Sequence, residues 1–344
     1  MARLRKTDPS SPGIARKRRG RGFSYVGPRG GAIEDEVTLA RIRALAIPPA
    51  WEDVWICSDE RGHLQATGVD AAGRRQYRYH DEWRRRRDTQ KFRRIEDFAR
   101  VLPDLRETVT ADLARPELDR LRVLACAIRL LDQGFFRVGS EEYAVRNGSF
   151  GLATLRKSHV TLEGAVATFD FMAKSGKRRI QVVRDPEVAE VLRRLKRRRG
   201  GGLELLAHRE DGRWHDLRAT DINAYLKERC GEAHSAKDFR TWHATVLAAV
   251  DVASAPDPSG RTAVRKAIAS TARTVSEYLG NTPAVCRSSY IDPRVFDRYA
   301  EGLTVAPALA GLDDPMEDQA ARELIESAVL DLIAGVDPAL PVAA

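Results

Sequence analysis

The stretch that decides the fold is residues 159–183, "HVTLEGAVATFDFMAKSGKRRIQVV", in which apolar and polar residues alternate. A period of two predicts β-strands with one buried face. Two turn signals, Glu163-Gly164 and Ser175-Gly176, divide the stretch, and short loops of this kind join neighbouring antiparallel strands. The stretch therefore predicts a short three-stranded antiparallel sheet whose second turn carries Lys174.

Helical periodicity surrounds this sheet. Apolar residues recur at helical spacing from Leu118 to Leu131, and Gly134 stands where a C-cap glycine would end such a helix. Further helices are predicted over residues 187–198, 219–230, 242–254 and 261–279. We therefore expect residues 93–312 to form a mostly α-helical catalytic domain that holds one small sheet.

The N-terminal part has a different pattern. In residues 23–92, short apolar pieces are broken by Gly, Pro and Asp, and the segments 54–58 and 63–70 flank a turn as the strands of a hairpin do. This predicts a small β-rich N-terminal domain and an α+β protein. Residues 1–22 are rich in Arg, Lys, Gly, Pro and Ser, and we expect a disordered basic arm there.

Charge is unevenly distributed along the chain. The net charge is +9, but the first 310 residues carry 57 Lys and Arg against 41 Asp and Glu. Such a basic body favours a polyanionic partner, nucleic acid first and an anionic membrane surface second. Residues 313–344 form an acidic tail, where Ala321 to Leu332 mark an amphipathic helix suited to packing or to binding a partner.

Several function classes are disfavoured. No apolar run approaches the roughly 18 residues of a membrane span, and no apolar signal-peptide core begins the chain, so we expect a cytoplasmic protein with no membrane partner. With nucleic acid as its favoured partner, we expect it to be nucleoid-associated. Glycine-rich nucleotide-binding spacings are missing, which predicts no nucleotide and no cofactor. Paired metal-ligand spacing is also missing from the four cysteines, Cys57, Cys126, Cys230 and Cys286.

Four residues suit phosphoryl transfer without a metal ion: Arg137, Lys174, Arg240 and Tyr290. Each alone has an ordinary structural explanation, such as a salt bridge, a solvated turn lysine or a core tyrosine. Together they supply what the reaction needs. Arginine forks hold the non-bridging oxygens of a phosphate, a lysine can protonate the leaving oxygen, and a tyrosine can be the nucleophile.

Five ordered motifs between Phe23 and Glu301 resemble those of the type IB DNA topoisomerases, in particular the small poxvirus and bacterial kind. Any one of them would be weak support, but five in order at family-like separations are specific. The motifs are "GRRQYRYHDEW" (73–83), "FFRVGSEEY" (135–143), "FMAKSGKRR" (171–179), "KDFRTWHAT" (237–245) and "YLGNTPAVCRSSYIDP" (278–293).

The resemblance implies a role for each catalytic candidate. Tyr290 would attack a DNA phosphodiester and become linked to the 3′-phosphate. Arg137 and Arg240 would grip that phosphate, and Lys174 would protonate the leaving 5′-oxygen. Asn281 stands where many members have histidine; its amide can donate a hydrogen bond but cannot carry a proton or a charge. The cycle would need neither ATP nor metal, and strand rotation before resealing would relax supercoils.

The resemblance also implies a monomer that closes as a clamp around double-stranded DNA. It places a strand with Gln76, Tyr77 and Tyr79 in the major groove, and it makes Tyr143 a further candidate for DNA contact. We expect His243, three residues past Arg240, to be a structural histidine rather than a phosphate contact.

Two alternatives remain open at this stage. Tyrosine recombinases share the Arg, Lys, Arg, Tyr order, but they typically have a histidine three residues before the second arginine, where this chain has Lys237, and they usually begin with a helical domain. A basic DNA-binding protein without enzymatic activity is also compatible with the composition, and Asn281 leaves room for a degenerate site.

Overall fold

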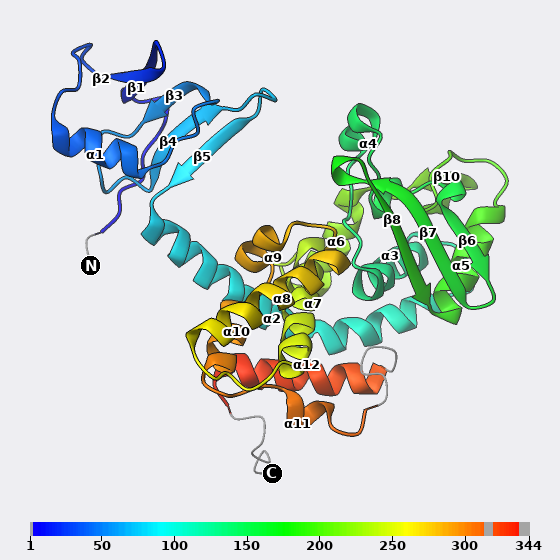
Figure 1. Ribbon diagram of the computed structural model, residues 1–344. Helices are drawn as coiled ribbons and strands as arrows, with labels where there is room; N and C mark the ends of the chain where they lie inside the picture. Colours follow the sequence, from blue (N-terminus) through cyan, green and yellow to red (C-terminus); the bar gives the residue numbers. More distant parts are fainter. Residues whose placement is uncertain (1–2, 313–318, 337–344) are drawn as a thin grey trace. The chain divides into compact units, whose positions relative to one another are not determined.

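The computed structural model describes residues 3–312 and 319–336 and divides into two compact units, Met1–Phe92 and Arg93–Ala344 (Figure 1). The first unit is built on a β-sheet and the second is mostly helical, which confirms the predicted α+β class. Helix α2 (Asp81–Leu113) starts in the first unit and ends in the second, so the arginine-rich segment 83–94 is helical throughout. No helix of the described residues is both long and apolar enough to cross a membrane.

The first unit is a five-stranded antiparallel sheet in the order β2-β1-β3-β4-β5 with one helix, α1 (Glu36–Ala44). Its core is small and includes the buried side chains of Ile42 and Ile56. The predicted hairpin is confirmed as the antiparallel pair β3–β4. The strands are β1 (Ile14–Arg19), β2 (Gly22–Val26), β3 (Glu52–Ile56), β4 (Leu64–Val69) and β5 (Arg75–Tyr79).

The prediction of a disordered arm over residues 1–22 is wrong for the segment from Ile14 onward, which forms β1 and the start of β2. Strand β1 pairs with both β2 and β3, and Ile14 is buried opposite Ile56. Arg16 lies 4.1 Å from the centre of the Phe23 ring and donates to the carbonyl oxygen of Pro48. A long basic side chain can pack its stem and bond its head to backbone, so basic composition alone does not keep this segment unfolded.

The predicted three-stranded sheet of the second unit is confirmed, in the order β6-β7-β8. Its strands are β6 (Val160–Glu163), β7 (Val166–Ala173) and β8 (Lys177–Arg184). Ser175 and Gly176 both have a φ of 67° in the β7–β8 loop, a left-handed backbone that the short turn requires. Lys174 begins this loop. A second hairpin, β9 (Ala207–Glu210) with β10 (Arg213–Asp216), is an addition to the prediction.

Ten helices of the second unit follow α2 in the described residues, and they include all those predicted. Helix α7 begins at Ala236 rather than at residue 242, because Asp238 accepts from the backbone N–H of Ser235 in a capping box. The helices are α3 (Arg120–Gly134), α4 (Glu141–Asn147), α5 (Pro186–Arg197), α6 (Ala219–Cys230), α7 (Ala236–Ala253), α8 (Arg261–Leu279), α9 (Pro283–Ser289), α10 (Pro293–Ala300), α11 (Ala306–Leu309) and α12 (Gln319–Ala334).

Gly134 has a different role from the one predicted. The left-handed residue that ends α3 is Phe135, with a φ of 54°, and Gly134 lies within the last helical turn. A Cβ atom on Gly134 would lie 2.3 Å from the ring of Phe136. The glycine is therefore needed because the buried Phe136 ring packs directly on its backbone.

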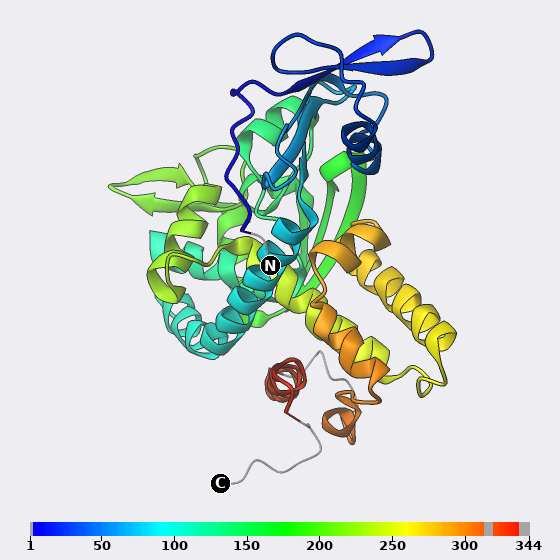
Figure 2. The ribbon, with the colours of Figure 1, turned by 90° about the vertical axis from the view of Figure 1, so that its left-hand side faces the viewer.

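Helix α12 is a packing element of the second unit. It is the red helix of Figures 1 and 2. It contacts α7, α10 and α11, and its apolar face, which includes Ile325 and Val329, is buried. The rest of the predicted acidic tail, residues 313–318 and 337–344, lies outside the described residues.

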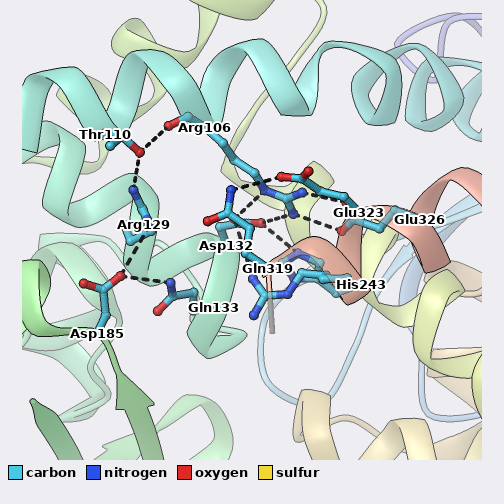
Figure 3. Close-up of polar contacts among 11 residues, drawn as sticks. Arg106, Thr110, Arg129, Asp132, Gln133, Asp185, His243, Gln319, Glu323 and Glu326 are labelled. Carbon is cyan, nitrogen blue, oxygen red and sulfur yellow. Dashed lines mark hydrogen bonds and ion pairs between the residues drawn. The ribbon is translucent and has the colours of Figure 1, made fainter. Parts of the chain in front are cut away.

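A buried ion network joins α12 to the centre of the second unit (Figure 3). Arg106 of α2 donates to both carboxylate oxygens of Asp132 on α3, at 2.9 and 3.0 Å, and to both of Glu326 on α12, at 2.7 and 3.0 Å. All three side chains are less than 10% exposed. Burial disfavours the charged form of Asp132, but Arg106 and His243 outweigh it and hold the pKa of Asp132 well below its usual range.

Removing one partner of this network is expected to destabilise the second unit. Glu326→Ala leaves the buried Arg106 side chain with a single carboxylate, and we expect the free energy of unfolding to fall by about 3 kcal/mol. Glu323→Ala on the same helix is the matched control, because Glu323 is exposed, and it should change stability by less than about 0.5 kcal/mol. Denaturant unfolding measures both, and equal stability of the two variants would contradict the expectation.

Candidate active site

Arg137 is held in place by close backbone packing after α3. The carbonyl oxygens of Arg137 and Val138 accept from the N–H groups of Leu152 and Ala153, each at 2.8 Å. Gly139 packs against Gly151, because a Cβ atom on Gly151 would lie 2.5 Å from the Gly139 α-carbon. A larger side chain at either glycine would push the backbone of residues 137–139 away from that of residues 151–153. The two glycines therefore hold the Arg137 backbone in place.

Arg240 connects the ends of two helices. Its side chain is 3% exposed on α7, where Nη1 donates to the carbonyl oxygen of Phe135 at 2.6 Å and Nη2 donates to that of Leu279 at 2.9 Å. Burial, together with the nearby charge of Arg137, lowers the pKa of Arg240 to about 10. The guanidinium therefore remains mostly charged at neutral pH.

Asn281 follows the left-handed Gly280 that ends α8, and it bonds directly to Arg137. Arg137 Nη2 donates to the Gly280 carbonyl oxygen at 3.3 Å and to Asn281 Oδ1. Since a guanidinium only donates, Oδ1 must face it, which leaves Asn281 Nδ2 available as a donor. This Nδ2 is buried and has no hydrogen-bond partner among the residues that the structure describes.

Tyr290 ends helix α9 close to two cations. The helix is capped by Thr282, and the residues after Tyr290 are tied to α7, because the N–H of Asp292 donates to Thr245 Oγ1 at 3.1 Å. The centre of the half-buried Tyr290 ring lies 5.5 Å from the guanidinium carbon of Arg240 and 5.9 Å from Nζ of Lys237.

These cations change the acidity of the Tyr290 hydroxyl. Burial raises the pKa of a phenol, but the charges of Arg240 and then Lys237 favour the phenolate more strongly, so the pKa of Tyr290 lies below its ordinary value. The nearby Asn281 amide also lowers the pKa of Tyr290, although its Nδ2 does not form a hydrogen bond with the described residues. The surroundings of Tyr290 therefore favour a nucleophilic oxygen.

A pocket of about 320 Å³ brings the candidates together. Arg137, Lys174, Lys237, Arg240 and Tyr290 all line it, and Lys174 reaches it from the exposed β7–β8 loop. Asn281 adjoins them through Arg137. The cationic side chains around one phenol suit an anionic group that the phenol could attack.

Sequence reasoning missed two basic residues near this pocket. Lys237 lines the pocket because it precedes Arg240 by three residues on α7 and so shares its helical face. Arg179 donates to the carbonyl oxygens of Glu277 and Tyr278, about a hundred residues away in the chain. No local sequence pattern predicts that contact.

His243 belongs to the buried network rather than to the pocket. Its Nε2 lies 3.2 Å from Asp132 Oδ1, and its ring is 4% exposed (Figure 3). This contact links α7, which carries Arg240, to α3, after which Arg137 follows. The structural interpretation of His243 therefore agrees with its position.

The candidates for DNA contact lie in two places. On β5 of the first unit, Tyr77 and Tyr79 are exposed and their rings stack with centres 6.1 Å apart. Gln76 is on the opposite face of the strand and donates to Asp70 at 2.8 Å. Tyr143 lies in α4 of the second unit, and its side chain is outside what the structure describes.

Within the described residues, no group of three or more His, Cys, Asp or Glu side chains could hold a metal ion. The candidate groups that line the pocket are Arg, Lys and Tyr side chains, and Asn281 adjoins them; such groups act through charge, hydrogen bonds and a hydroxyl.

Comparisons with known proteins agree with the resemblance of the motifs. The family model described as the catalytic core of eukaryotic DNA topoisomerase I matches residues 80–305, and that of the bacterial DNA topoisomerase IB N-terminal domain matches residues 22–70. The chain is also 32% identical over 274 residues to DNA topoisomerase 1B of Acanthamoeba polyphaga mimivirus, which amounts to 77% of this chain and 82% of the relative.

Proposed function

This chain belongs to the type IB DNA topoisomerases and is an isomerase that acts on DNA, and we propose that it relaxes supercoils by transiently cutting one strand. The observation that carries the proposal is the convergence of Tyr290 with Arg137, Lys174 and Arg240 on one pocket. These residues come from four separate segments of the chain. Since one chain supplies them all, we further propose that a monomer is sufficient for the reaction.

In the cutting step, Tyr290 Oη forms a bond to a backbone phosphorus and the bond from that phosphorus to the 5′-oxygen breaks. The phenol proton passes to solvent water, which the lowered pKa of Tyr290 favours, and the leaving 5′-oxygen receives a proton from the Lys174 ammonium group. Resealing is the reverse reaction: the 5′-hydroxyl attacks the phosphotyrosyl ester and releases Tyr290. Between the two steps, rotation of the free end changes the linking of the strands.

Charge builds up on the phosphate oxygens as the phosphorus becomes five-coordinate. Arg137 and Arg240 are positioned by backbone carbonyls on the same helix end, so they are pre-ordered to receive this charge. Asn281 Nδ2 supplies one further neutral donor, which can bind an oxygen but cannot shuttle a proton.

The proposed chemistry needs no outside energy source. The phosphotyrosyl ester retains the energy of the broken phosphodiester, so ATP is not consumed. The positive charges that stabilise the transition state are side chains of the protein, which supports activity without a bound metal ion.

Relaxation of a supercoiled plasmid, with EDTA present and ATP left out, tests this function. We expect complete relaxation through closed circular intermediates, together with a protein–DNA adduct after denaturation in which the protein is on the 3′-phosphate. Binding without relaxation would favour the alternative of a non-enzymatic DNA-binding protein. Exchange of strands between two duplexes in preference to relaxation would favour a recombinase.

We also propose that the two units close around duplex DNA as a clamp, with Tyr77 and Tyr79 of β5 on the duplex. The exposed, stacked rings on an edge strand of a basic domain support this. The affinity for a non-cleavable duplex is expected to fall steeply with salt, with a log–log slope of about −0.9 for each phosphate neutralised. Binding titrations at a series of salt concentrations measure this slope. An affinity that does not change with salt would contradict the proposed clamp.

A further inference from the structure

Arg179 extends from the sheet to the end of helix α8. It lies on β8, an edge strand, where Gln181 and Val183 share its face and are buried while Ile180 and Val182 are exposed on the other face. The Arg179 Nη1 donates to the carbonyl oxygen of Glu277 at 2.8 Å, and Nη2 donates to that of Tyr278.

The end of α8 is occupied by three arginines. The last carbonyl groups of a helix lack partners within the helix, and the negative end of its dipole attracts cations. In α8 the four carbonyls of residues 277–280 are all taken: Arg179 bonds the first two, Arg240 bonds the third and Arg137 bonds the fourth. Arg137 and Arg240 therefore share their anchor with Arg179.

Arg179 also packs on the residue before Asn281. Its Nη1 is only 3.2 Å from where a Cβ atom on Gly280 would lie, so the guanidinium covers the Gly280 α-carbon. The carbonyl oxygen of the same Gly280 accepts from Arg137. The two arginines together determine where the peptide between Gly280 and Asn281 lies.

The same side chain connects two parts of the active site. Lys174 is in the loop of the β7–β8 hairpin, and Arg179 is opposite Phe171 in that hairpin. Asn281 and Tyr290 follow α8. We propose that Arg179 is a positioning residue for strand cleavage, which holds the hairpin of Lys174 in register with the segment of Asn281 and Tyr290. This inference rests on the proposed function and adds a residue to it.

The test compares Arg179→Ala with Arg178→Ala on the full chain. Arg178 is the adjacent residue, pairs with Asp170 on the exposed side of the hairpin and carries the same charge, so it controls for lost attraction to DNA. The cleavage rate constant is measured in single turnover on a labelled duplex at saturating enzyme, alongside duplex affinity and thermal stability. We expect Arg179→Ala to cleave about 10- to 100-fold more slowly than Arg178→Ala, as a misplaced group would.

Arg179→Lys separates positioning from folding, because a lysine keeps the charge but loses the planar fork that spans two carbonyls. We expect it to have native stability and a cleavage rate between those of native protein and Arg179→Ala. Equal cleavage by the two alanine variants would overturn the inference. If that equal rate came with a weaker duplex affinity for Arg179→Ala than for Arg178→Ala, Arg179 would be a DNA contact instead. If the native protein did not form the covalent protein–DNA adduct, that result would contradict the proposed function instead.

Discussion

Tyr290→Phe is expected to lower strand cleavage by at least about 10⁴-fold, because the variant keeps the ring but lacks the atom that we propose forms the ester. Plasmid relaxation should disappear, and so should the covalent adduct on a labelled duplex. Affinity for the duplex should remain close to native, since the ring still packs beside Arg240 and Lys237.

The matched control is Tyr278→Phe, which removes a hydroxyl from another tyrosine of the same motif. Tyr278 is 49% exposed, and only its backbone carbonyl bonds to Arg179, so this variant should relax DNA at the native rate. A covalent adduct formed by Tyr290→Phe would show that a different residue is the nucleophile. Loss of duplex binding by Tyr290→Phe would make the phenol a binding group instead.

Arg240→Ala is expected to give the second largest effect, a loss of about 10²- to 10³-fold in the cleavage rate constant. This is the usual cost of removing one donor that stabilises charge in the transition state. The variant also leaves the carbonyl oxygens of Phe135 and Leu279 without their donor. Each unsatisfied buried group costs about 1 to 3 kcal/mol, so stability should fall as well.

Two further variants separate chemistry from stability in the Arg240 experiment. Arg240→Lys keeps a charge but cannot bond two carbonyls in a fixed plane, and it should recover stability more than rate. Arg137→Ala removes the other arginine, whose side chain is less deeply buried, and should slow cleavage with less loss of stability. Single-turnover cleavage and denaturant unfolding measure these effects. Native cleavage by either alanine variant would exclude that arginine from the phosphate site.

Much of the fold could be predicted because its signals are local. The sheet of residues 160–184 follows from alternation and two glycine turns, and α3, α5, α6 and α8 follow from helical spacing within each segment. Errors occurred where a local pattern had a second explanation. Arg16 of β1 packs on Phe23 and bonds to backbone, and Gly134 makes room for a ring instead of being the left-handed residue that caps α3.

The sequence by itself determined which candidate catalytic residue types are present and in what order, because each of the five motifs is a continuous stretch with its own turn or helix signal. Only the tertiary structure decided how they meet. The carbonyl groups at the end of α8 receive Arg137, Arg179 and Arg240 across separations of 39 to 143 residues, and Arg106 binds Glu326 across 220. Such contacts depend on which helix ends and strand faces come together when the core forms, and a hydrogen bond between distant segments leaves no periodic trace in either one.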